Sequence, residues 1–234
     1  MKKRRFVQGV IVCTLLSLAT PLYADTPWLH TDANLIKDPN GNVVVLRGVD
    51  TIDLGALLWY GELPGLIDMV TNKSDSQGNS PGWYTRVIRL AVYPAQETDF
   101  SSPFTFDPND STEAYYNYLL RPIVDYCKTK DLYVIIDWHF VGDNTYDRVE
   151  ETNAFWSYMA PRFAGDSHVL FELFNEPGNT GGSDVANWLT CRPDMQTWIN
   201  IIRASAPNNL ILVDRKSTRL NSSHEIPSRM PSSA

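Results

Sequence analysis

The sequence has few cysteines, three in 234 residues, so a fold held together mainly by disulfides is excluded. Cys13 lies near the N-terminus, and the sequence leaves open whether Cys127 and Cys191 are bonded or free. No apolar stretch reaches the ~20 residues that a membrane-spanning helix needs. The rest of the composition, 43% hydrophobic and 12% aromatic, is typical of a globular protein.

Basic residues are scarce in the central part of the chain. Residues 25–213 contain 12 basic and 25 acidic side chains, a net charge of −13. This charge argues against nucleic acid and against an anionic membrane as partners. Neutral and cationic substrates remain possible.

Residues 1–24 have the pattern of a secretory signal peptide. Four basic residues at positions 2–5 precede the apolar run Phe6–Ala19, and the small residue Ala24 follows shortly before Asp25. The apolar run is too short for a membrane anchor, which is the alternative interpretation. We therefore predict cleavage near Ala24 and a secreted protein, extracellular or periplasmic, with no membrane contact afterwards.

Residues 214–234 differ from the rest of the chain because they are rich in Ser and Arg and have no periodic apolar pattern. A disordered tail is one interpretation. However, codons for Asp214–His224 can spell a widely used short-read sequencing adapter, and codons for Ser228–Ala234 can spell its continuation. We therefore predict that 214–234 is a non-native tail, and we exclude His224 and Glu225 from any site.

Five short apolar runs recur about every forty residues between positions 25 and 213. Continuous rather than alternating apolar residues predict strands that are buried on both faces, as in a parallel sheet. Helical spacing predicts helices between them, and Asp38–Gly41 predicts a hairpin turn before the first run. The predicted strands are 43–49, 87–93, 132–138, 169–174 and 210–213, and the predicted helices are 112–130, 150–163 and 195–204.

Strands and helices in series predict either a doubly wound sheet or a (β/α)8 barrel. No G-x-G-x-x-G loop follows the first strand, which favours the barrel. Eight units of this repeat length would need roughly 320 residues, whereas the chain has five units. The predicted fold is therefore an α/β (β/α)8 TIM barrel, residues 25–213, truncated after about the fifth strand.

Polar residues stand where these strands end, and barrels gather their chemistry at that rim. Asn175 and Glu176 follow the fourth strand, while Trp138 and His139 end the third. A carboxylate at an apolar rim loses hydration, which favours its protonated form and suits a proton donor. A solvent-facing Glu and a structural His are the alternative interpretations.

Two charged residues belong to the first two strands. Arg89 lies within an apolar run, so burial requires an acidic partner for its guanidinium. Asp50 ends the first strand, where we expect it to cap the following helix.

The segments LRGVD, VIRLAVYP, LYVIIDWHF and FELFNEPGN, in this order, resemble glycoside hydrolase family 5 over residues 28–213. The DWH segment followed 37 residues later by Glu176 is most similar to the cellulase branch. The resemblance implies a (β/α)8 barrel that hydrolyses polysaccharide with retention, without metal or cofactor. It implies Glu176 as general acid/base, and Arg89, His139, Asn175 and Trp138 as residues that bind substrate.

The chain departs from the family pattern after Val213. The family's nucleophilic Glu would lie beyond that residue, and nothing in 214–234 replaces it. We therefore expect a fragment of a β-1,4-glucanase, monomeric when full length and inactive as it stands. Alternatives are a mannanase or xylanase of the same family, a complete five-unit domain, and a non-catalytic barrel that binds sugars by stacking on Trp59, Tyr93, Trp138 and Trp188.

Overall fold

The computed structural model describes residues 26–59, 61, 63–72, 83–94, 107, 112–141, 145–178 and 184–214. The predicted signal peptide lies outside the described residues, and so does the predicted non-native tail apart from Asp214. Within these ranges, no helix is both long enough and apolar enough to cross a membrane.

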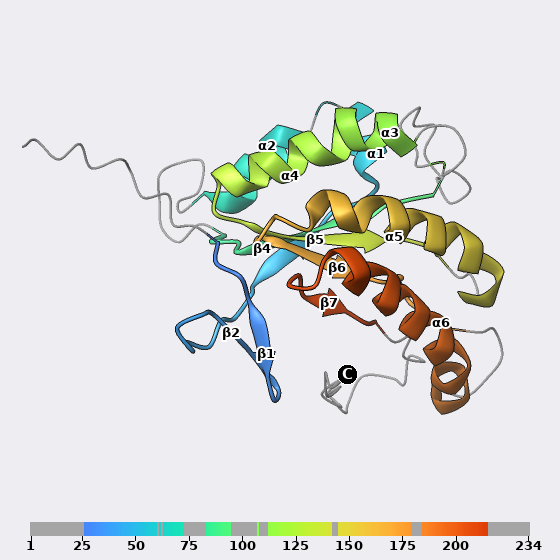
Figure 1. Cartoon of the computed structure of the whole chain (residues 1–234). Helices are drawn as coiled ribbons and strands as arrows, with labels where there is room; N and C mark the ends of the chain where they lie inside the picture. The colour runs from blue at the N-terminus through green and yellow to red at the C-terminus, as the bar shows by residue number, and fades with distance from the viewer. Residues whose placement is uncertain are drawn as a thin grey trace, which may run out of the picture.

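The main sheet has five parallel strands in the order β3-β4-β5-β6-β7, which is also their order along the chain. Helices cover one face of this sheet (Figure 1), and the strand–helix units follow each other in series. The fold is therefore that of a (β/α)8 barrel truncated after its fifth strand, as the sequence predicts. The strands are β3 Gly48–Asp50, β4 Val87–Val92, β5 Tyr133–Trp138, β6 Val169–Glu172 and β7 Ile211–Leu212.

Helical segments lie where the apolar periodicity predicts them. The expected helix 112–130 is one continuous segment with a wider turn inside it, and the expected helix 150–163 starts one residue earlier. The last helix begins at Asp184 rather than at Met195, because the chain stays helical through Pro193. The segments are α1 Leu54–Trp59, α2 Leu63–Thr71, α3 Thr112–Tyr115, η1 Tyr116–Leu120, α4 Arg121–Thr129, η2 Thr145–Arg148, α5 Val149–Phe163 and α6 Asp184–Ser205.

The largest apolar core lies between the sheet and the helices. Alternate residues of β4 and β5 point into it, because successive side chains of a strand point to opposite faces. Much of the aromatic content lies in this layer: the Trp138 and Phe155 rings stack at 4.1 Å, and those of Phe174 and Trp198 at 5.6 Å. Cys127 and Cys191 are both buried and free, which answers the question that the sequence left open.

A second, smaller core lies on the other face of the sheet, the face that would line a barrel. Leu29, Val87, Tyr133 and Leu170 are buried there. The β1–β2 hairpin, His30–Asp32 and Leu35–Lys37, projects at one end of the sheet (Figure 1). Its own turn is at residues 33–34, and the predicted turn at 38–41 follows as a second one, where Gly41 has a φ of 82°.

The first apolar run is only partly a strand of the main sheet. β3 begins at Gly48, while Val43 and Val45 are 54% and 65% exposed, so the prediction of burial on both faces is wrong for them. Val43 instead pairs with Lys37 and extends the hairpin. A Cβ on Gly48 would come within 1.7 Å of the Val87 carbonyl oxygen, so glycine permits the close approach of β3 to β4.

Candidate active site at the carboxyl ends of the strands

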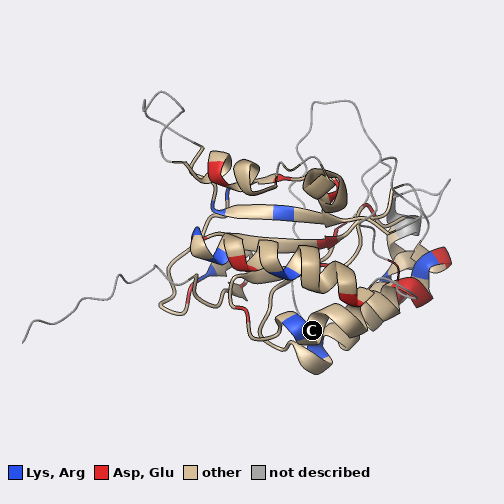
Figure 2. Cartoon of the chain, turned by 90° about the horizontal axis from the view of Figure 1, so that it is seen from above, with Lys and Arg blue, Asp and Glu red and all other residues tan. Residues whose placement is uncertain are grey.

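Many charged residues lie on helices and loops, and each of the strands β3, β4, β5 and β6 contains one charged residue (Figure 2). Arg89, in the middle of β4, is the cation among them, and its side chain is 18% exposed. Its Nε and Nη2 donate to the two oxygens of Glu172, both at 2.8 Å. The sequence-based expectation that Arg89 has an acidic partner is confirmed.

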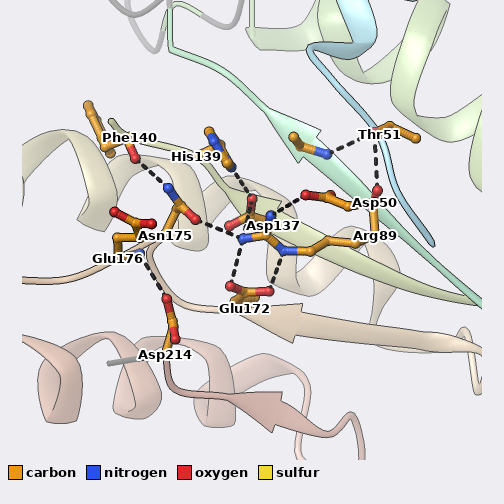
Figure 3. Close-up of polar contacts among 11 residues, drawn as sticks. Asp50, Thr51, Arg89, Asp137, His139, Phe140, Glu172, Asn175, Glu176 and Asp214 are labelled. Atoms are coloured by element: carbon orange, nitrogen blue, oxygen red, sulfur yellow. Dashed lines mark hydrogen bonds and ion pairs between the residues drawn. The ribbon is translucent and has the colours of Figure 1, made fainter. Parts of the chain in front are cut away.

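Arg89 also binds the neighbouring strands on both sides (Figure 3). Its Nη1 donates to Asp50 at 3.0 Å, and its Nη2 lies 2.8 Å from Asp137. The same Nη2 donates to the Asn175 side-chain oxygen at 3.0 Å. One guanidinium therefore joins β3, β4, β5 and β6 near the end where their carboxyl termini meet.

The charge balance of this cluster explains how it stays buried. Three carboxylates face one guanidinium, and those of Asp137 and Glu172 are almost completely buried. Burial alone would lower the pKa of Arg89, but the bonds to Glu172 and the charge of Asp137 outweigh it and raise that pKa. Burial, followed by the charge of Glu172, raises the pKa of Asp137 well above its ordinary value, although Arg89 opposes the shift.

His139 lies directly beyond β5 on the same face as Asp137. Its Nδ1 is 2.5 Å from Asp137 Oδ2, and its ring lies against that of Tyr93 with centroids 4.3 Å apart. Burial, followed by the charge of Arg89, lowers the pKa of His139 to about 4. His139 is therefore neutral near pH 7, and its contact with Asp137 is a hydrogen bond rather than an ion pair.

Asn175 and Glu176 follow β6 and reach the same cluster. Asn175 accepts from Arg89 and donates through Nδ2 to the Phe140 carbonyl at 2.8 Å, so both ends of its amide are held. Glu176 lies beside it (Figure 3) at a φ of 44°, a left-handed conformation that is uncommon outside glycine. Its backbone N–H donates to the Asp214 carboxylate at 3.0 Å.

The expected desolvation of Glu176 is not found, because its side chain is exposed in the described structure. Glu176 lies beyond the last residue of β6, next to Asn175 (Figure 3). The left-handed backbone conformation of Glu176 is nevertheless of a kind that is found more often at functional sites than elsewhere.

The prediction that Trp138 binds substrate is wrong for this structure. The residue is completely buried, and its Nε1 donates to Thr152 Oγ1 of α5 at 3.1 Å. Because Asp137 and His139 point to the inner face, Trp138 between them must point to the helices. Of the other rings considered for sugar stacking, Trp59 is 62% exposed, and Tyr93 and Trp188 are partly buried.

The expected capping role of Asp50 is also wrong, because that carboxylate binds Arg89. Asp53 has the capping role instead: its Oδ1 accepts from the Gly55 N–H at 2.9 Å, at the start of α1. Thr51 between them ties the end of β3 to β4, since its N–H donates to the Arg89 carbonyl oxygen at 3.0 Å.

Two residues of this cluster were missed from the sequence, Asp137 and Glu172. Each is a lone acid inside or at the end of a run of apolar strand residues, which is the same signal that identified Arg89. Within the described part of the chain, no group of three or more His, Cys, Asp or Glu residues is arranged to hold a metal ion.

Comparison with known proteins was made at three levels. A sequence model of the cellulase family, glycosyl hydrolase family 5, matches residues 37–231. Cellulase CelDZ1 of Thermoanaerobacterium sp is 26% identical over 183 residues, covering 76% of this chain and 42% of that protein. An endoglucanase of Clostridium saccharobutylicum is 31% identical over 179 residues, covering 75% of this chain and 34% of that protein.

The solved structure of Cellulase Cel5C_n is similar in fold, with a TM-score of 0.65 and 23% identity over 86% of this chain and 57% of that one. The chain thus spans less than half the length of these two curated relatives and little more than half of the solved structure.

Proposed function

The chain belongs to the cellulase family, glycosyl hydrolase family 5, and on this premise we propose that it is part of a secreted, retaining endo-β-1,4-glucanase. The observation that carries the proposal is the position of Glu176. It follows directly on Asn175, whose amide is held on both sides by Arg89 and Phe140. A carboxylic acid at the rim of the sheet, beside a fixed amide, suits protonation of a glycosidic oxygen next to a bound sugar.

In the proposed reaction, Glu176 gives its proton to the glycosidic oxygen as the bond from that oxygen to the anomeric carbon breaks. A second carboxylate attacks the same carbon and forms a glycosyl-enzyme. Glu176, now ionised, takes a proton from water, and the resulting oxygen nucleophile releases the sugar and frees the second carboxylate. The proposed nucleophile lies beyond Val213, in the part of the relatives that this chain does not cover.

Secretion is proposed from residues 1–24, and the substrate from the relatives, several of which are named endoglucanase. The acidic character of residues 25–213 fits a neutral polysaccharide and disfavours nucleic acid. Arg89, His139 and Asn175 are proposed to surround the sugar whose bond is cleaved, since they form one connected cluster next to Glu176.

The test uses the full-length protein encoded by the source gene. It is incubated with β-1,4-glucan, β-mannan and xylan, and the anomer formed first is identified by proton NMR. We expect fastest cleavage of the glucan, with the β-anomer released first. Faster cleavage of mannan or xylan would change the assigned substrate. Binding without hydrolysis would indicate a non-catalytic barrel, and release of the α-anomer would contradict the mechanism.

A further inference from the structure

The side chains of Asp137 and His139 form a closely spaced pair on the inner face of the sheet. The two residues are separated by one position along the chain, so both point to the same face. The carboxylate oxygen Oδ2 lies 2.5 Å from Nδ1 of the imidazole (Figure 3). A second donor, Nη2 of Arg89, lies 2.8 Å from the same oxygen.

The contacts of Asp137 determine which atom of this pair carries the proton. Oδ2 lies 2.8 Å from Nη2 of the permanently charged Arg89 guanidinium, whose positive charge favours an unprotonated oxygen there, so this oxygen acts as an acceptor. Oδ1 has no hydrogen-bond partner within the described residues. A proton added to the carboxyl group on Oδ1 would leave Oδ2 an acceptor all the same. In both cases, the short contact is explained when Nδ1 of His139 is the donor.

The other surroundings of His139 hold the ring in place. Its backbone N–H donates to the Val92 carbonyl at 3.0 Å, and the Tyr93 ring packs against the imidazole. The imidazole is neutral near pH 7, since burial and Arg89 both disfavour the cation. A neutral imidazole carries one N–H, and the hydrogen bond made by one nitrogen sets the state of the other.

We infer that Asp137 is a positioning residue that keeps His139 in the Nδ1–H tautomer, so that the Nε2 lone pair accepts a hydrogen bond from a sugar hydroxyl. This inference rests on the proposed function for the identity of the ligand. The opposite tautomer would make Nε2 a donor, and the ring would then select a different hydroxyl geometry.

The first experiment reads the tautomer directly and needs no activity. The full-length protein is labelled with ¹⁵N in its histidines, and proton–nitrogen correlation spectra are recorded near neutral pH. The His139 signals are assigned by their absence in His139→Gln. We expect Nδ1 to show the shift of a protonated nitrogen and Nε2 that of an unprotonated one. A proton on Nε2 would overturn the inference.

The second experiment asks whether the tautomer affects substrate recognition. Values of kcat/KM are measured for a cello-oligosaccharide and for analogues that each lack one hydroxyl. In the unmodified enzyme, one analogue should lose at least ~10-fold, the scale of one hydrogen bond. In Asp137→Ala, the oxygen that accepts from Nδ1 is lost and nothing holds the proton on that nitrogen, so that penalty should fall several-fold.

The matched control is Asp166→Ala. Asp166 also pairs with an arginine, accepting from Arg121 Nη1 at 2.6 Å, but it precedes β6 at the opposite end of the sheet. This variant should keep the full penalty for the missing hydroxyl. An unchanged penalty in a folded Asp137→Ala would contradict the inference. Absence of hydrolysis by the unmodified full-length protein would refute the proposed function, and the NMR result would still decide the tautomer.

Discussion

Removing the positive charge of Arg89 should destabilise the protein far more than removing one of the carboxylates that surround it. Arg89→Leu leaves Asp50, Asp137 and Glu172 facing one another without a cation. Breaking a buried ion pair by deleting one partner costs about 3–5 kcal/mol, and two of these three carboxylates are almost completely buried. We expect a loss in unfolding free energy in that range for the full-length protein.

Glu172→Gln is the matched variant with the same shape. It removes one of two hydrogen bonds to a charged group, which costs about 1.5–3 kcal/mol, but it also relieves repulsion between Glu172 and Asp137. Arg89 keeps Asp137 and Asp50 as partners. The net loss should therefore be at most about 2 kcal/mol, clearly below that of Arg89→Leu.

The pH dependence provides a second check on the same variants. Burial raises the pKa of Asp137, and without Arg89, which opposes that shift, it stays above the pKa of the unfolded chain, so the folded state binds more protons and gains stability as pH falls. Urea unfolding at pH 7 and at pH 5 should show a smaller deficit for Arg89→Leu at the lower pH. Equal losses for the two variants, or a deficit independent of pH, would refute the reasoning.

Three further predictions concern Glu176, Trp138 and the isolated segment 25–213. Glu176→Gln in the full-length enzyme should slow cleavage of unactivated polysaccharide by at least ~10²-fold. For substrates with good leaving groups, the same variant should slow formation of the glycosyl-enzyme much less. Equal losses for the two kinds of substrate would rule out the acid role. Trp138→Phe should lower the free energy of unfolding by about 1 kcal/mol, because the hydrogen bond to Thr152 is lost, and should leave kcat/KM unchanged. A large fall in kcat/KM would indicate that Trp138 does contact the substrate. Residues 25–213 alone should release no reducing sugar from soluble cellulose. They should also show no cooperative melting by calorimetry, since an open sheet leaves two unpaired edges. An active monomer with a sharp melting transition would contradict both expectations.

The predicted non-native tail, residues 214–234, can be checked on the source gene. Amplification past codon 213 should yield three further strand–helix units rather than the sequence of residues 214–234. Recovery of the same 21 residues from genomic DNA would show that the predicted non-native tail is native.

The sequence predicts the order and spacing of the strands because buried parallel strands need continuous apolar runs. It fails at residues 43–46, where the run is equally apolar but lies outside the main sheet: Val43 pairs with the hairpin, and Val44 and Leu46 pack against the smaller core. Local composition is the same in both arrangements, so only tertiary pairing distinguishes them.

The site residues, too, could be predicted only in part from the sequence. The need for a partner of Arg89 follows from the cost of burying a charge, but the identity of the partner depends on strand register, which brings residues 83 positions apart together. The error at Trp138 could have been avoided: two-residue alternation places Asp137 and His139 on one face and the residue between them on the other. The exposure of Glu176 depends on what lies beyond β6, and no local pattern reports it.

The central claim is that Glu176 is the acid/base of a retaining glycosidase, and chemical rescue of Glu176→Ala tests it most directly. The full-length variant is given an aryl glycoside, whose leaving group needs little protonation, so the glycosyl-enzyme forms but awaits a base. Azide needs no base to attack. The account predicts that azide accelerates turnover and that the product is the β-glycosyl azide. No acceleration by azide, or an α-glycosyl azide, would contradict the role assigned to Glu176.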